Sequence, residues 1–119
     1  MPEIALRREL HRRGYRYRVD YAPLPTMRRR RADIVFTRQK IAVFLDGCFW
    51  HGCGEHGTLT TANRDWWRNK IQANHERDHD TNTRLRDAGW RVIRIWEHQS
   101  QEEAVDSIVT ALEDQRRKT

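Results

Sequence analysis

The stretch from Asp33 to His51 reads DIVFTRQKIAVFLDGCFWH and decides the fold of the chain. Two apolar runs, residues 34–36 and 41–45, flank a short polar turn, which predicts a β-hairpin whose strands lie in a core. Asp33 enters the first strand and Asp46 leaves the second, so antiparallel pairing would bring both carboxylates to one edge of the sheet. Carboxylate oxygens at such an edge suit a hard cation such as Mg2+.

Length and charge bound the possibilities. The chain has 119 residues, which is enough for one domain with one modest core, expected over residues 1–119. Its 23 Lys and Arg residues against 17 Asp and Glu residues give a net charge of +6. Much of the excess is arginine in short runs before residue 32, and the planar guanidinium matches phosphate oxygens. We therefore expect a polyanion as the partner, most simply nucleic acid, the alternative being an ordinary solvated basic face.

Cysteine usage and hydropathy indicate the compartment. No apolar run is long enough to cross a bilayer, and the N-terminus enters an amphipathic pattern without a secretory signal. In a reducing compartment the two cysteines favour metal binding over a disulfide. We expect a cytoplasmic monomer with no membrane partner.

The other elements follow from periodicity and from the glycines that end helices. In the first helix, Ile4, Leu6 and Leu10 are expected to face the core. The chain order predicts a small α/β fold with a mixed sheet flanked by helices. The expected elements beside the hairpin are helices over 3–13, 65–88 and 102–117 and strands over 15–19 and 90–96.

A possible zinc site comes from four residues that are far apart in the chain. Cys48, Cys53 and His56 fall in or beside a loop rich in Gly and Thr, and His98 follows the last strand. Two sulfurs and two imidazoles make a tetrahedral set suited to structural zinc. Two free, partly buried cysteines are the alternative.

A second set carries acid and base chemistry. Asp33, Asp46, His51 and Asp78, with the more distant Glu3, supply carboxylates for a metal and a histidine that a carboxylate could orient. Phosphodiester hydrolysis needs both. Taken singly, an acid at a strand end is often a turn or capping residue, and His51 alone could be a loop residue.

Four aromatic residues surround this region: Phe49, Trp50, Trp66 and Trp67. They can stack on bases or wedge between base pairs. Alternatively, these aromatic side chains pack in the protein core.

Five segments of the chain read, in order, PEIALRRELHRRGYRYR, DIVF, AVFLDGCFWHGC, WWRNKIQANHERD and LRDAGWRVIRIWEH. Together they resemble the Vsr (very short patch repair) DNA mismatch endonucleases, which act on double-stranded DNA. This resemblance implies a restriction-endonuclease-like fold of the PD-(D/E)XK type, a requirement for Mg2+, a structural zinc, and nicking of DNA 5′ to the T of a T:G mismatch. It also implies a nucleoid-associated bacterial protein that could meet mismatch-repair proteins.

The resemblance assigns roles to the acids and the histidine. Asp33 matches the metal-binding aspartate, and Leu45 stands where a backbone carbonyl is the second ligand. His51 matches the base and Asp78 the aspartate paired with it. Glu3 matches a glutamate near a water molecule of the metal.

The resemblance also assigns the remaining candidates. It implies that Cys48, Cys53, His56 and His98 hold the zinc, with His98 in place of the usual cysteine. Three aromatic side chains match those that push into DNA beside the mismatch: Phe49, Trp50 and Trp67.

Two departures from the family pattern keep alternatives open. Asp46 stands where a second active-site histidine is usual, so Asp46 itself could bind the metal. The chain begins almost at Glu3, whereas the family carries an N-terminal arm that embraces DNA, so mismatch specificity stays open. The alternatives are a catalytically weak DNA-binding module and a restriction or defence nuclease of the same fold.

Overall fold

The computed structural model describes residues 3–46 and 64–118, with side chains for all of these except 64–67 and 118. Its elements are α1 (Glu3–Arg12), β1 (Arg18–Tyr21), β2 (Ala32–Phe36), β3 (Ile41–Asp46), α2 (Arg64–Asp87), β4 (Arg91–Trp96) and α3 (Gln101–Lys118). Within this part of the chain, no helix is both long and apolar enough to span a membrane.

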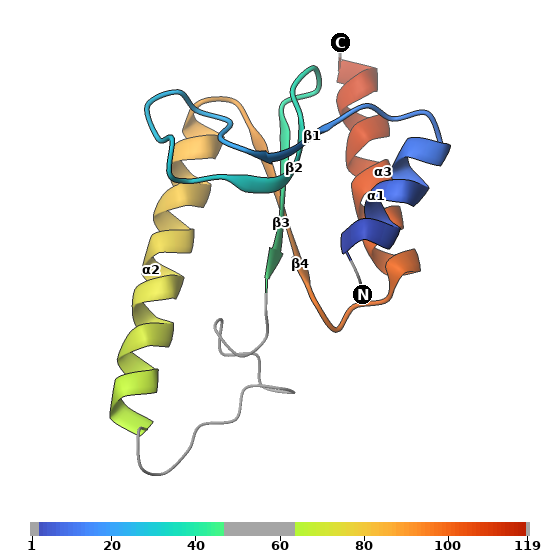
Figure 1. Ribbon diagram of the computed structural model, residues 1–119. Helices are drawn as coiled ribbons and strands as arrows, with labels where there is room; N and C mark the ends of the chain where they lie inside the picture. The colour runs from blue at the N-terminus through green and yellow to red at the C-terminus, as the bar shows by residue number, and fades with distance from the viewer. Residues whose placement is uncertain (1–2, 47–63, 119) are drawn as a thin grey trace.

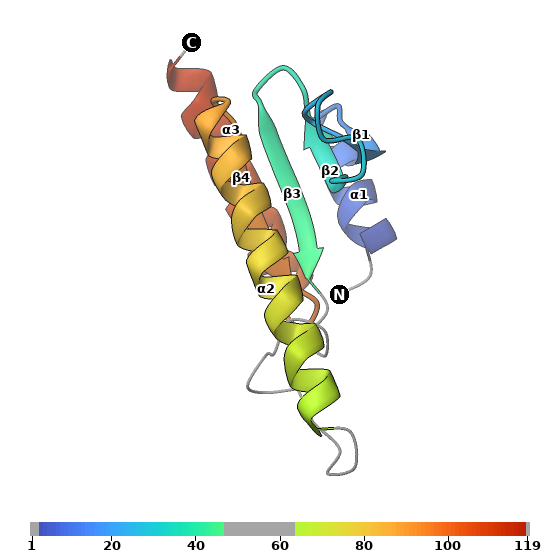
Figure 2. The ribbon, with the colours of Figure 1, turned by 90° about the vertical axis from the view of Figure 1, so that its left-hand side faces the viewer.

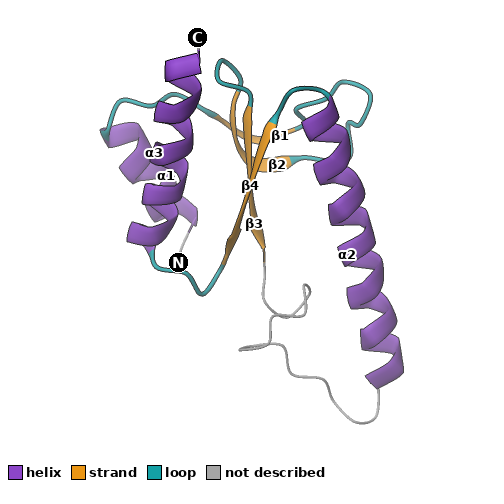
Figure 3. Ribbon diagram, turned by 180° about the vertical axis from the view of Figure 1, so that it is seen from behind, coloured by secondary structure: helices purple, strands orange, loops and turns teal. Residues whose placement is uncertain are grey.

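The four strands form one mixed sheet in the order β1-β2-β3-β4. β1, β2 and β3 are antiparallel neighbours, whereas β4 runs parallel to β3 because α2 carries the chain back between them. The helices lie on both faces, with α1 and α3 together on one side and α2 alone on the other (Figures 1 and 3). The predicted mixed sheet flanked by helices is thus confirmed.

The hairpin is confirmed at the residues that predict it. Ile34 pairs with Val43 and Phe36 with Ile41, and both strands are buried on two faces, as continuous apolar runs require. Lys40 closes the turn with a left-handed φ of 58°.

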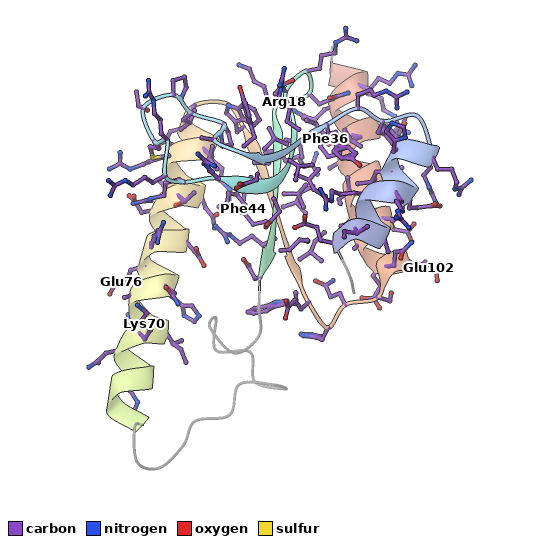
Figure 4. The ribbon with its side chains drawn as sticks, in the orientation of Figure 1. Arg18, Phe36, Phe44, Lys70, Glu76 and Glu102 are labelled. Carbon is purple, nitrogen blue, oxygen red and sulfur yellow. The ribbon has the colours of Figure 1, made fainter. Side chains whose placement is uncertain are left out.

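Alternation along the strands divides the core into two layers. Phe36 points toward α1 and α3, and Phe44 points toward α2 (Figure 4). The first layer is the larger and includes Leu6 of α1 and Ile108 of α3, both fully buried. The second layer is small, and Leu85 is its fully buried contribution from α2.

Two predicted details are wrong. Ile4 is 55% exposed, because it lies about 200° around the helix from Leu6, at about 100° per residue. Residues 15–17 do not form the first strand, which begins at Arg18. Tyr15 and Tyr17 instead pack on the core and donate their hydroxyls to Glu113 Oε1 and to the carbonyl of Arg7.

α2 is much longer than the strand beside it. Its 24 residues span about 36 Å at 1.5 Å per residue, against about 20 Å for the six residues of β3. Its N-terminal turns extend past the end of the sheet (Figure 2). The middle of α2 therefore lies level with the end of β3, where the candidate site is found.

Candidate active site at the end of the sheet

A hollow of about 320 Å³ lies between α2, the end of β3 and the loop that precedes β2. Because Ile34 pairs with Val43, Asp33 falls opposite Phe44, on the same face as Asp46 two residues later. Asp33, Asp46 and Asp78 all line the hollow. The predicted meeting of the two hairpin acids is confirmed to this extent, and α2 adds the third.

The Asp33 carboxylate is fixed by the hairpin itself. Its Oδ2 accepts a hydrogen bond from the backbone amide of Leu45 at 2.7 Å. The Glu3 carboxylate lies beside it: burial raises the pKa of Glu3, and the neighbouring charge of Asp33 raises it further, against the opposing effect of Arg7. Two neighbouring carboxylates, one of which raises the proton affinity of the other, are also suited to share a cation.

Asp46 has a different partner. Its side chain is buried and its Oδ1 accepts a hydrogen bond from Nη1 of Arg94 at 3.0 Å. The same Nη1 lies 3.6 Å from Oδ1 of Asp78, and Arg94 Nε donates to Oδ1 of Asn82 at 2.9 Å. The guanidinium also covers the ring of Phe44, 4.2 Å from its centroid.

Sequence reasoning missed Arg94. β4 alternates, and Arg94 pairs with Phe44 in the ladder, so it shares the face of Val92 and Trp96 that α2 covers. A single arginine at such an inward position is the signal that could have identified it, because a buried guanidinium needs carboxylate or amide partners.

The arginines of the run before β2, residues 28–31, have different surroundings. Arg30 turns toward α2, where its Nη1 donates to Asp80 Oδ2 at 2.8 Å and to Thr81 Oγ1 at 2.7 Å. Hydrogen bonds from Arg30 and then from Arg84 lower the pKa of Asp80. The exposed side chains of the neighbouring arginines and of one arginine on α2 rim the hollow: Arg29, Arg31 and Arg77.

Several predicted site residues lie outside the described part of the chain. Of the predicted zinc ligands, only His98 is described: it follows β4, is exposed, and its ring stacks on Trp96 with centroids 6.2 Å apart. Among the described residues, no group of three or more His, Cys, Asp and Glu could hold a metal by itself. The predicted residues outside the description are Cys48, Phe49, Trp50, His51, Cys53 and His56, together with the side chain of Trp67.

Comparison with known proteins identifies the family. The model of the family described as DNA mismatch endonuclease Vsr matches residues 1–56. The type II nicking enzyme V.NaeI of Lentzea aerocolonigenes is 48% identical over 112 residues, which cover 93% of this chain and 68% of that protein. The chain belongs to the Vsr family.

Two further relatives extend the range of this Vsr-family comparison. The type II nicking enzyme V.XorIIP of Xanthomonas oryzae pv. oryzae is 41% identical over 97 residues, 81% of this chain and 68% of that protein. The DNA mismatch endonuclease Vsr of Escherichia coli is 38% identical over 85 residues, 71% of this chain and 52% of that protein. The chain is accordingly a DNA endonuclease.

Proposed function

We propose that this Vsr-family endonuclease acts as a monomer on double-stranded DNA and nicks one strand in a Mg2+-dependent reaction. The target is 5′ to the T of a T:G mismatch, in very short patch repair. The observation that carries the proposal is the carboxylate pair of Glu3 and Asp33 beside a hollow rimmed by arginines. Carboxylates offset the charge of a metal, and guanidinium groups bind the phosphates of a DNA backbone.

The fold supports the same function. A mixed sheet with helices on both faces carries acids at the ends of β2 and β3. This is the arrangement expected of a restriction-endonuclease-like domain of the PD-(D/E)XK type, which we propose as its fold family.

The donor set at Asp33 fits Mg2+. This ion is commonly bound by one or two carboxylates, with waters and substrate phosphate oxygens completing six positions. Asp33 would bind it directly, Leu45 through its backbone carbonyl, and Glu3 through a water molecule. When bound, the metal would polarise the phosphoryl oxygen and offset the charge that develops there.

The protein's own residues would supply the base and the contacts with DNA. His51 would accept the proton of the attacking water, and Asp78 would hold the imidazole in the required tautomer. Arg29, Arg31 and Arg77 would bind phosphates around the hollow. The aromatic residues would stack against the bases beside the mismatch: Phe49, Trp50 and Trp67.

A structural zinc held by Cys48, Cys53, His56 and His98 is part of the proposal. The ladder between β3 and β4 ends where Glu97 N–H donates to the carbonyl of Asp46 at 3.0 Å. His98 is the next residue after Glu97, and Cys48 is two residues after Asp46 in the sequence. This adjacency along the chain supports a metal that joins the two strand ends.

A second candidate function is nicking at a fixed sequence in matched DNA, as part of a restriction or defence system. The names of V.NaeI and V.XorIIP as type II nicking enzymes favour it.

One experiment separates these functions. End-labelled duplexes, matched and carrying one T:G pair, are incubated with the protein in Mg2+ and in EDTA. Nicking of the mismatched duplex alone, and only with Mg2+, is the expected result. Equal nicking of both duplexes would favour the second candidate, and the absence of nicking would favour a DNA-binding module.

A further inference from the structure

Arg94 joins Asp46 and Asp78, the two acids that line the hollow together with Asp33. It projects from β4 on the face covered by α2, and only 20% of its side chain is exposed. Nη1 contacts Asp46 on β3 at 3.0 Å and Asp78 on α2 at 3.6 Å. Nε donates to Asn82, one helical turn beyond Asp78. One guanidinium thus holds α2 against the end of the sheet.

The geometry uses what distinguishes arginine from lysine. The planar guanidinium points different N–H groups at different acceptors at the same time, whereas an ammonium is a point charge on a flexible stem. The ring of Phe44, 4.2 Å away, covers one side of the plane. The side chain is therefore fixed on its face and along its edge.

Asp46 is arranged as the counter-ion of this guanidinium. Its side chain is 10% exposed, so its charge is poorly screened by water. A cation placed on Asp46 would meet the positive charge of Arg94 at close range. Asp33, by contrast, accepts from a neutral amide and lies beside another carboxylate.

We propose that Arg94 is a positioning residue that takes Asp46 out of the metal site and holds Asp78 in place for catalysis. The inference rests on the proposed metal-dependent nuclease function. It assigns the metal to the Asp33 side of the hollow alone, and it makes Asp46 the counter-ion of Arg94.

Metal binding tests the first half. Mn2+, a spectroscopic substitute for Mg2+, is titrated into the free protein and followed by electron paramagnetic resonance. Asp46→Asn keeps an oxygen that Arg94 can bond, so it should leave the Mn2+ dissociation constant at the wild-type value. Asp33→Asn removes a direct carboxylate ligand and should raise that constant about tenfold or more, at least as much as loss of an outer-shell partner does. An equal rise in both variants would show that Asp46 is a ligand and overturn the inference.

Kinetics test the second half. Arg94→Met keeps most of the side-chain volume and should lower kcat for nicking by about 10–100-fold, as loss of an outer-shell partner does, with KM for DNA nearly unchanged. Arg94→Lys should recover only part of kcat. Arg91→Met is the matched control, because Arg91 lies at the other end of β4 and forms a 2.7 Å ion pair with Asp114 of α3. This variant should leave kcat unchanged.

The outcomes separate the possible failures. Wild-type kcat in Arg94→Met or full recovery in Arg94→Lys would make Arg94 merely structural and overturn the inference. Should Arg94→Met fail to fold, Arg94→Lys decides between these results. Normal nicking by Asp33→Asn would instead remove the proposed metal site, and with it the function on which the inference rests.

Discussion

The side chain of Asp33 accepts a hydrogen bond from the backbone amide of Leu45, 2.7 Å from N to Oδ2. This bond joins the first residues of β2 to the end of β3 and fixes the carboxylate on the face that α2 covers. The acid is thereby held by the backbone, so its position follows from the register of the hairpin. Glu3 reaches the same carboxylate from α1, on the first turn of the chain's first helix.

DNA binding should depend steeply on salt because arginines rim the hollow. The logarithm of the association constant should fall with the logarithm of salt concentration by about 0.9 for each phosphate contacted. Arg29→Ala and Arg77→Ala should each reduce that slope by about 1. Arg117→Ala, on the exposed end of α3, is the control and should leave the slope unchanged. Fluorescence anisotropy of labelled DNA at several salt concentrations measures this slope. A slope near zero for the wild type would contradict a phosphate-binding surface.

The contact between Arg30 and Asp80 should make stability depend on pH. The hydrogen bonds from Arg30 and Arg84 lower the pKa of Asp80 in the folded protein below its ordinary value of 3.8. The Asp80 carboxylate therefore binds a proton more readily in the unfolded chain than in the folded protein. The stability that this contact contributes is fully present above pH 3.8 and is lost as the pH falls through the lower pKa of the folded state. Asp80→Asn should lower the Tm at neutral pH.

Thermal melts of wild type and Asp80→Asn from neutral to strongly acidic pH check this. The difference in Tm should shrink toward zero in acid, where the wild-type carboxyl is protonated as well. A difference that stays constant over the whole range would show that the charge of Asp80 contributes nothing. Glu102→Gln, at the start of α3, is a control for the loss of one exposed acid.

Removal of His98 should affect both stability and nicking through the proposed zinc. His98→Ala should lower the zinc content below one per chain, lower the Tm and slow nicking, because structural zinc binding adds to folding stability. His98→Phe is the sharper variant, since it keeps a ring to stack on Trp96 but cannot bind metal. Both should behave alike. Elemental analysis that finds no zinc in wild-type protein purified without chelator would reject the site.

The sequence predicts the hairpin and the helices well because their signals are local. The runs on either side of Thr37–Lys40 are apolar at every position, so neither strand has a polar face for solvent, and both are central strands of the sheet. The prediction fails at residues 15–17 because the alternation YRYR matches a strand, while the tyrosines are drawn to the core beside α1 and α3. Tertiary packing there overrides local pattern.

The site is predictable only where chain order fixes the geometry. Antiparallel pairing alone places Asp33 and Asp46 on one face at one end of the sheet. The partner of Asp46 depends on the parallel register of β4, which sets Arg94 beside Phe44 across 50 residues of sequence. No local sequence pattern encodes that register. The position of Arg94 between Asp46 and Asp78 is therefore known only from the structure.

The most direct test of the central claim is single-turnover nicking by Asp33→Asn in Mg2+, with DNA affinity measured in parallel. Asparagine keeps an oxygen for the Leu45 amide, so the fold should persist, while the metal loses its carboxylate. Loss of several kcal/mol of Lewis-acid stabilisation should slow nicking by about a hundredfold or more, at about 1.4 kcal/mol per tenfold. DNA affinity should be unchanged, and Asp106→Asn on α3 should nick at the wild-type rate. Near-wild-type nicking by Asp33→Asn would contradict the account.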